Sequence, residues 1–112
     1  MDLENKDDRH KYMIKKLRMD IAYNVRLIRI QHDWTQDQLA ERCHTEQPAI
    51  SQVENWNAEF PSTDTLKRIA EAFDCGLMIR FDGWEEIINS IVPEYSNDEG
   101  MSIVDRAISS VK

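Results

Sequence analysis

The stretch Thr35-Gln-Asp-Gln-Leu-Ala-Glu-Arg-Cys-His-Thr-Glu-Gln-Pro-Ala-Ile-Ser-Gln-Val-Glu-Asn55 decides the fold. It predicts a short helix, a turn of three or four residues and a second short helix. Thr35 followed by Gln38 is the pattern of a capping box, in which the hydroxyl and the amide satisfy free backbone donors at a helix start. Because isolated helices of this length are marginal in water, both must pack on each other and on flanking helices.

The apolar residues leave the outer face of the second helix polar. Leu39, Ala40 and Cys43 share a face of the first helix, and Ile50 and Val53 lie three residues apart in the second. The outer face then presents uncharged side chains that form hydrogen bonds, namely Gln47, Ser51 and Gln52. Such side chains suit the edges of DNA base pairs.

Residues 10–31, before this stretch, predict one long amphipathic helix, because apolar residues recur there at steps of three and four. Residues 1–9 are densely charged and are expected to be disordered. Lys11, Lys15 and Arg18 form a basic stripe at helical spacing. Two interpretations of this stripe stay open, namely a solvated face and a surface that contacts phosphates or a partner.

After the stretch, a helix capped by Ser62 or Thr63 is predicted to run to Phe73, and Gly76 is a natural stop. These segments predict a helix-turn-helix domain over residues 10–76.

Residues 77–81 are predicted to form a short strand. A lone strand leaves its backbone groups unsatisfied, so we expect it to pair with the same strand of a second subunit. With a short helix predicted at 84–92, it would make residues 77–92 a dimerisation element. Residues 93–112 are interpreted as a linker and an apolar tail helix, which docks on the domain or binds a partner protein.

Charge is distributed unevenly along the 112 residues, whose formal net charge is −7. Residues 1–32 hold eight basic and five acidic side chains (net +3), and residues 33–112 hold six and sixteen (net −10). The negative total counts against tight DNA binding, which depends on neutralising phosphates. The charged N-terminus and the lack of a run of about 18 apolar residues predict a cytoplasmic protein without membrane contact.

The composition does not favour catalysis or a cofactor. Cys43 and Cys75 fit reduced core positions better than a disulfide or a metal pair. A serine elbow, a glycine-rich phosphate loop and a metal-spaced cluster are all missing from the sequence, so an enzyme is not expected.

A set of spaced residues also carries a family resemblance. It covers about residues 22–75 and consists of Arg29, Thr35-Gln36, Leu39-Ala40, Ile50-Ser51, Glu54, Pro61, Leu66 and Ile69-Ala70. Together these residues resemble the phage-repressor and Cro-like (XRE) helix-turn-helix family. The resemblance implies an all-α, lambda-repressor-like bundle of five helices. Its third helix, about residues 47–55, would be the recognition helix of a dimer that binds double-stranded DNA.

The resemblance also implies roles for individual residues. Gln36 would contact a phosphate through the start of the second helix, and Asn55 would meet the DNA backbone. The expected DNA-binding set is Gln36, Gln47, Pro48, Ser51, Gln52 and Asn55. Arg29 and Glu54 would form a buried structural ion pair, and breaking such a pair leaves a buried charge uncompensated.

Two positions near the turn depart from the family pattern. His44 stands where the family commonly has glycine, and a left-handed histidine is tolerable but strained. A metal site at Cys43 and His44 is not expected, because adjacent side chains at a helix end point apart. Glu46 replaces the usual serine or threonine; its carboxylate suits the helix dipole but would face a phosphate.

Pro48 is a third departure. It fixes the first helical turn and pushes Gln47 toward an extended conformation, so Gln47 is either the cap of the helix or a base-contacting residue. Gln52 is the stronger candidate for base contact, because glutamine pairs bidentately with adenine.

Two functions follow from these expectations. The first is a sequence-specific transcriptional regulator, repressor-like, that recognises a palindromic operator as a dimer. The alternative is an antitoxin-like protein that binds a partner through its C-terminal tail and regulates its own operon.

Overall fold

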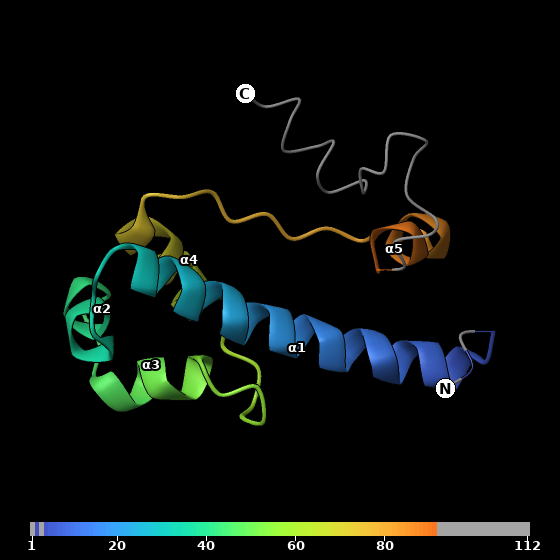
Figure 1. Cartoon of the computed structure of the whole chain (residues 1–112), viewed down its shortest axis with the longest axis horizontal. Coiled ribbons are helices and arrows are strands. Elements are labelled where there is room, and N and C mark those ends of the chain that lie inside the picture. Colours follow the sequence, from blue (N-terminus) through green and yellow to red (C-terminus); the bar gives the residue numbers. More distant parts are fainter. Residues whose placement is uncertain (1, 3, 92–112) are drawn as a thin grey trace. The chain divides into compact units, whose positions relative to one another are not determined.

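The structure is a computed structural model, and it describes residue 2 and residues 4–91. In that part the chain is all-helical, as predicted, and contains no strand (Figure 1). The helices are α1 (Lys6–Gln31), α2 (Gln36–Arg42), α3 (Gln47–Val53), α4 (Thr63–Phe73) and α5 (Trp84–Ile91). The chain divides into two compact units, Met1–Leu77 and Met78–Lys112. None of the described helices has the length and apolar character that crossing a bilayer requires.

The long first helix begins earlier than the sequence pattern predicts. The side chain of Asn5 caps it by accepting a hydrogen bond from the backbone nitrogen of Asp8 at 3.1 Å, and Asp7 and Asp8 favour the positive end of the helix dipole. The prediction of disorder over residues 1–9 is therefore wrong from Lys6 onward. Apolar periodicity starts only further along the chain, whereas the cap decides where the helix begins.

A small core holds α1, α2, α3 and α4 together. Leu39 of α2 and Ile50 of α3 are fully buried, and Trp34 packs against the edge of this core. The other buried members are Val25, Ala40, Cys43, Val53, Ile69 and Phe73. Burying a side chain of the size of leucine or isoleucine stabilises the fold by roughly 1.5–3 kcal/mol. The core residues that the apolar spacing predicts in α2 and α3 are the ones that meet.

Helices α2 and α4 both begin at the side-chain caps that the sequence predicts. Thr35 and Gln38 form the complete capping box, with hydrogen bonds of 3.1 and 2.8 Å between each side chain and the other residue's backbone nitrogen. Ser62 caps α4 by accepting from the backbone nitrogen of Thr65 at 3.1 Å. These caps fix where α2 and α4 begin.

The turn between α2 and α3 depends on a left-handed residue. His44 has φ 55°, which is the strained conformation that the sequence predicts. The backbone nitrogen of Thr45 donates to the Ala40 carbonyl at 2.9 Å, and that of His44 donates to the Glu41 carbonyl at 3.1 Å. This is a Schellman motif, the usual way to end a helix with a glycine.

Replacing His44 with glycine is expected to raise the free energy of unfolding by about 0.5–1 kcal/mol. Glycine removes the left-handed strain of roughly 1–2 kcal/mol, and it loses part of this gain through the greater entropy of the unfolded chain. Thermal unfolding followed by circular dichroism measures the change as a higher Tm. His44→Ala is the matched control, because it removes the imidazole but keeps Cβ. If alanine raised the Tm as much as glycine, backbone strain would not be the cause.

The segment after α4 differs from the prediction. Residues 75–83 form no regular element in the single chain, so the strand predicted at 77–81 is not present there, and the side chains of Met78, Ile79 and Phe81 are exposed. Its pairing with a second subunit stays a prediction. A strand needs a neighbouring backbone, and an apolar run cannot become one by itself. Helix α5 begins where a short helix is predicted. The linker and tail helix expected at 93–112 lie outside the described residues, so partner binding by the tail stays a prediction.

The two cysteines differ in environment. Cys43 is buried, and desolvation raises the pKa of its thiol, which lies 3.8 Å from the Arg68 carbonyl oxygen. Cys75 is exposed, so the prediction that it occupies the core is wrong. It follows Asp74, whose left-handed backbone ends α4 and turns the chain away from the helix axis. Both thiols are free.

Candidate nucleic-acid interface

Helix α3 presents a polar face to solvent. Ile50 and Val53 point into the core, whereas Ser51 and Gln52 are exposed. Pro48 and Asn55 are exposed as well, and Gln47 is half-buried. The helix ends at Val53, so Asn55 lies in the turn that follows it. Apart from Glu46 at the N-cap, the exposed side chains along this face carry no charge.

The start of α3 corrects one expectation about Gln47. The N-cap is Glu46, in an extended conformation and without a capping hydrogen bond from its side chain. Pro48 occupies the first turn, as its fixed φ allows. Gln47 is therefore the first helical residue and not the cap, although a proline disfavours a helical backbone at the residue before it.

A chain of side-chain hydrogen bonds joins α3 to α2. Gln47 Nε2 donates to Gln36 Oε1 at 2.7 Å, and Gln36 Nε2 donates to Glu54 Oε1 at 3.2 Å. Both amides are therefore held in place at the N-terminal ends of the two helices. In contrast, no hydrogen bond of the Ser51 hydroxyl or the Gln52 amide is found in the described part of the chain.

The chain of hydrogen bonds ends in a buried ion pair. Arg29 Nε and Nη2 donate to the two Glu54 carboxylate oxygens at 2.7 and 2.9 Å. The two side chains are 12% and 4% exposed. The hydrogen bond to Glu54 raises the pKa of Arg29, against the opposing effect of burial. Because the carboxylate is neutralised, it does not repel an anion at the face of α3.

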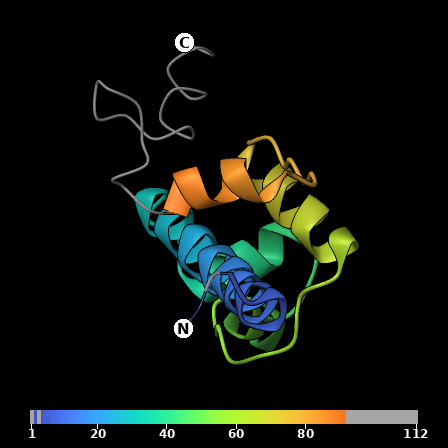
Figure 2. The same cartoon turned by 90° about the vertical axis from the view of Figure 1, so that its right-hand side faces the viewer.

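Arg18 has a role that the sequence interpretation missed. It belongs to the predicted basic stripe, but it is only 4% exposed. Its guanidinium donates to four backbone carbonyls at the end of α3 and in the turn that follows: Gln52 and Asn55 at 2.7 Å, and Val53 and Ala58 at 3.0 Å. The Gln52 and Asn55 carbonyls also accept from backbone nitrogens at 3.2 and 3.0 Å, whereas Arg18 is the partner found for the Val53 and Ala58 carbonyls in the described part of the chain. Figure 2, which looks along α1, shows the loop between α3 and α4 running beside that helix.

The residues of the predicted basic stripe therefore differ in role. Arg18 is structural, whereas Lys11 and Lys15 remain exposed. Burial lowers the pKa of Arg18, but a guanidinium stays charged in proteins. A signal in the sequence was available, because Arg18 shares a face with two buried residues four and seven positions later, Ala22 and Val25. A charge at a core position indicates a buried partner.

Comparisons with known proteins agree with this geometry. A family model described as helix-turn-helix matches residues 25–78. The chain is 42% identical over 59 residues to a competence pilus inhibition repressor of Acinetobacter baylyi, across 53% of this chain and 53% of that protein. It is also 42% identical over 52 residues to a Neisseria hypothetical transcription factor of Neisseria meningitidis, across 45% of this chain and 49% of that protein. The chain thus spans about half the length of these curated relatives. No solved structure matches it significantly.

The matched residues coincide with the part of the chain that builds the candidate interface. They include the C-terminal part of α1 together with α2, α3 and α4. The predicted resemblance to the Cro/C1-type (XRE) helix-turn-helix family is therefore confirmed over residues 25–78.

Proposed function

We propose that this protein is a sequence-specific, DNA-binding transcriptional regulator of the repressor type. The observation that carries the proposal is the exposed, uncharged outer face of α3, on which the Ser51 hydroxyl and the Gln52 amide have no partner among the described residues. Two relatives named as a repressor and a transcription factor support it. The regulator would act on DNA in the cytoplasm, and helix-turn-helix regulators are in general not enzymes.

Each residue of the interface has a chemical role in this proposal. Gln52 would pair with the edge of an adenine in the major groove, and the Pro48 ring would contact a thymine methyl group. Gln36, held by Gln47 and Glu54, would contact a phosphate together with the free backbone donors at the start of α2. Asn55 would meet the DNA backbone beyond the recognition helix. Base specificity then depends on residues in the middle of α3. The position of the protein along the DNA depends on the phosphate contacts made on either side of that helix.

We further propose that two copies bind one palindromic operator. The recognition helices of a dimer enter successive major grooves, whose centres lie roughly 34 Å apart along one face of the duplex. Doubling the contacts also offsets the weak electrostatic attraction expected from a chain of net charge −7.

Gln52→Ala is expected to weaken binding to the operator by about 10-fold or more for each domain, because a bidentate base contact is worth about 1–3 kcal/mol. Gel shift or fluorescence anisotropy with DNA from upstream of the protein's own gene, at low and high salt, measures the effect. Affinity for an unrelated duplex should stay unchanged, whereas Gln36→Ala should weaken both complexes.

Gln31→Ala serves as the matched control, because Gln31 is an exposed glutamine at the end of α1 and away from α3. It should bind the operator as the wild type does. Unchanged operator affinity in both Gln52→Ala and Gln36→Ala would show that the assigned residues are wrong.

A further inference from the structure

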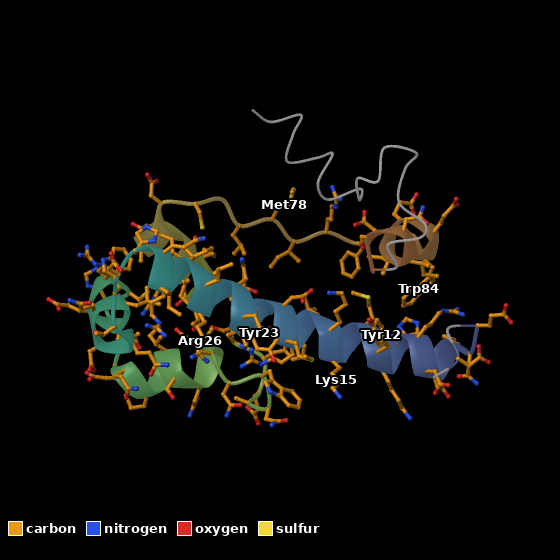
Figure 3. All side chains as sticks on the ribbon, in the orientation of Figure 1. Tyr12, Lys15, Tyr23, Arg26, Met78 and Trp84 are labelled. Carbon is orange, nitrogen blue, oxygen red and sulfur yellow. The ribbon has the colours of Figure 1, made fainter. Side chains whose placement is uncertain are left out.

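A groove of about 550 Å³ lies beside the outer face of α3, between α1 and the turn that follows α3. Its lining includes Tyr23 and Arg26 of α1, and Ser51 and Asn55 on the opposite side. Figure 3 shows Tyr23 and Arg26 on the side of α1 that faces α3. Gln36 lines the groove as well, so three of the proposed DNA contacts share it. The groove is therefore continuous with the proposed interface.

The groove contains hydrogen-bond donors without acceptors. Arg26 is exposed, and its guanidinium has neither a hydrogen bond nor an ion pair within the described part of the chain. The Ser51 hydroxyl is unpaired there too. The Asn55 side chain accepts from the backbone nitrogen of Asn57 at 3.0 Å through its oxygen, which leaves its amide nitrogen available. A guanidinium with neutral donors opposite it is a combination that binds oxyanions.

The charge of the groove also favours an anion. Among its lining residues, Glu54 carries the one carboxylate, and this carboxylate is held by Arg29 at 2.7 and 2.9 Å. The lining therefore holds two guanidiniums and one carboxylate, which leaves one excess positive charge. Lys15 extends this charge along α1, because its ammonium lies 5.6 Å from the ring centre of Trp56 at the edge of the groove. This local positive charge favours an anion in the groove although the net charge of the whole chain is negative.

We propose that this groove binds one backbone phosphate of the DNA, with Arg26 as its charged ligand. The inference rests on the proposed function, because it assigns a further contact to the same DNA-binding surface. Helix α1 then contacts the backbone of the DNA strand next to the base pairs that α3 recognises. A phosphate contact positions the protein and adds affinity without distinguishing base sequences.

Arg26→Gln is the direct test. It removes one positive charge from an exposed side chain without partners among the described residues, so the thermal unfolding of the protein should not change. Affinity for the operator and for an unrelated duplex should fall by the same factor, about tenfold for each bound domain. The slope of log affinity against log salt concentration should become shallower by about one for each domain.

Two further variants separate this contact from a general change in charge. Lys67→Gln removes the same charge from an exposed residue of α4, a helix that packs on α1 and α2, and should leave the affinity within about twofold of the wild type. Arg26→Lys keeps the charge and should preserve the salt slope, while it loses part of the affinity because lysine cannot form a fork of two parallel bonds.

Duplexes with single methylphosphonate linkages locate the phosphate. At one position of each half-site, the neutral linkage should weaken DNA binding by the wild type. It should not weaken binding by Arg26→Gln, because the variant has already lost that contact. Binding by Arg26→Gln with wild-type affinity and salt slope would overturn this inference and leave the proposed function standing. A wild-type protein that binds no duplex would overturn both.

Discussion

Replacing Arg18 by methionine is expected to destabilise the domain by about 3–5 kcal/mol, because it leaves the Val53 and Ala58 carbonyls without a partner at roughly 1–3 kcal/mol each. Arg18 donates to four carbonyls in all, at 2.7–3.0 Å. Small domains are stable by only about 5–15 kcal/mol, so the variant should be marginally folded at best. Urea denaturation followed by circular dichroism measures the change as a lower midpoint.

Two other substitutions make this experiment specific. Lys11→Met removes an exposed cation from the same helix and should shift stability by less than about 0.5 kcal/mol. Arg18→Lys keeps the charge but cannot reach four carbonyls in a fixed plane, so its stability should lie between those of the wild type and Arg18→Met. A methionine variant as stable as the wild type would show that the four hydrogen bonds do not hold the end of α3.

Glu54→Gln is the second large effect that we expect, with a loss of about 3–5 kcal/mol. The substitution preserves the size of the side chain but leaves the Arg29 guanidinium buried without a counter-charge. It also disturbs Gln36, which donates to the same carboxylate. The Glu54→Gln protein should therefore show a lower free energy of unfolding and, under conditions in which it remains folded, weaker DNA binding.

A double-mutant cycle distinguishes loss of the pair from loss of either side chain. Arg29→Met combined with Glu54→Leu should be more stable than Arg29→Met or Glu54→Gln alone, because no buried charge is left uncompensated. The cycle of Arg29→Met, Glu54→Leu and the double variant should give a coupling energy above about 1 kcal/mol. Strictly additive effects would mean that the two side chains do not act as a pair.

Local patterns predicted most of the domain. The capping box at Thr35 and Gln38, and the apolar spacing in α2, α3 and α4, are signals of short range, and each has a direct counterpart in the structure. The left-handed backbone at His44 is implied by the family resemblance, because His44 stands where the family commonly has glycine, and the structure confirms it.

The features that sequence patterns missed depend on partners far along the chain. Arg18 meets carbonyls 34 to 40 residues away. Its place on the buried face of α1 indicates a buried partner, but local spacing does not identify which backbone groups it meets. The apolar run at 77–81 has the composition of a strand, but composition does not supply a second backbone. The same holds for the groove beside α3, which exists only because α1 passes next to the turn that follows that helix.

The central claim is that α3 recognises a DNA sequence, and selection from a library of random duplexes tests it most directly. The purified protein is mixed with the library, bound duplexes are recovered at moderate salt, and their sequences are determined after several rounds. The account predicts enrichment of one motif, made of two inverted half-sites whose centres lie about one helical turn apart. The Gln52→Ala variant should lose the preference at one base pair of each half-site. Recovery of duplexes without any common motif would contradict the claim.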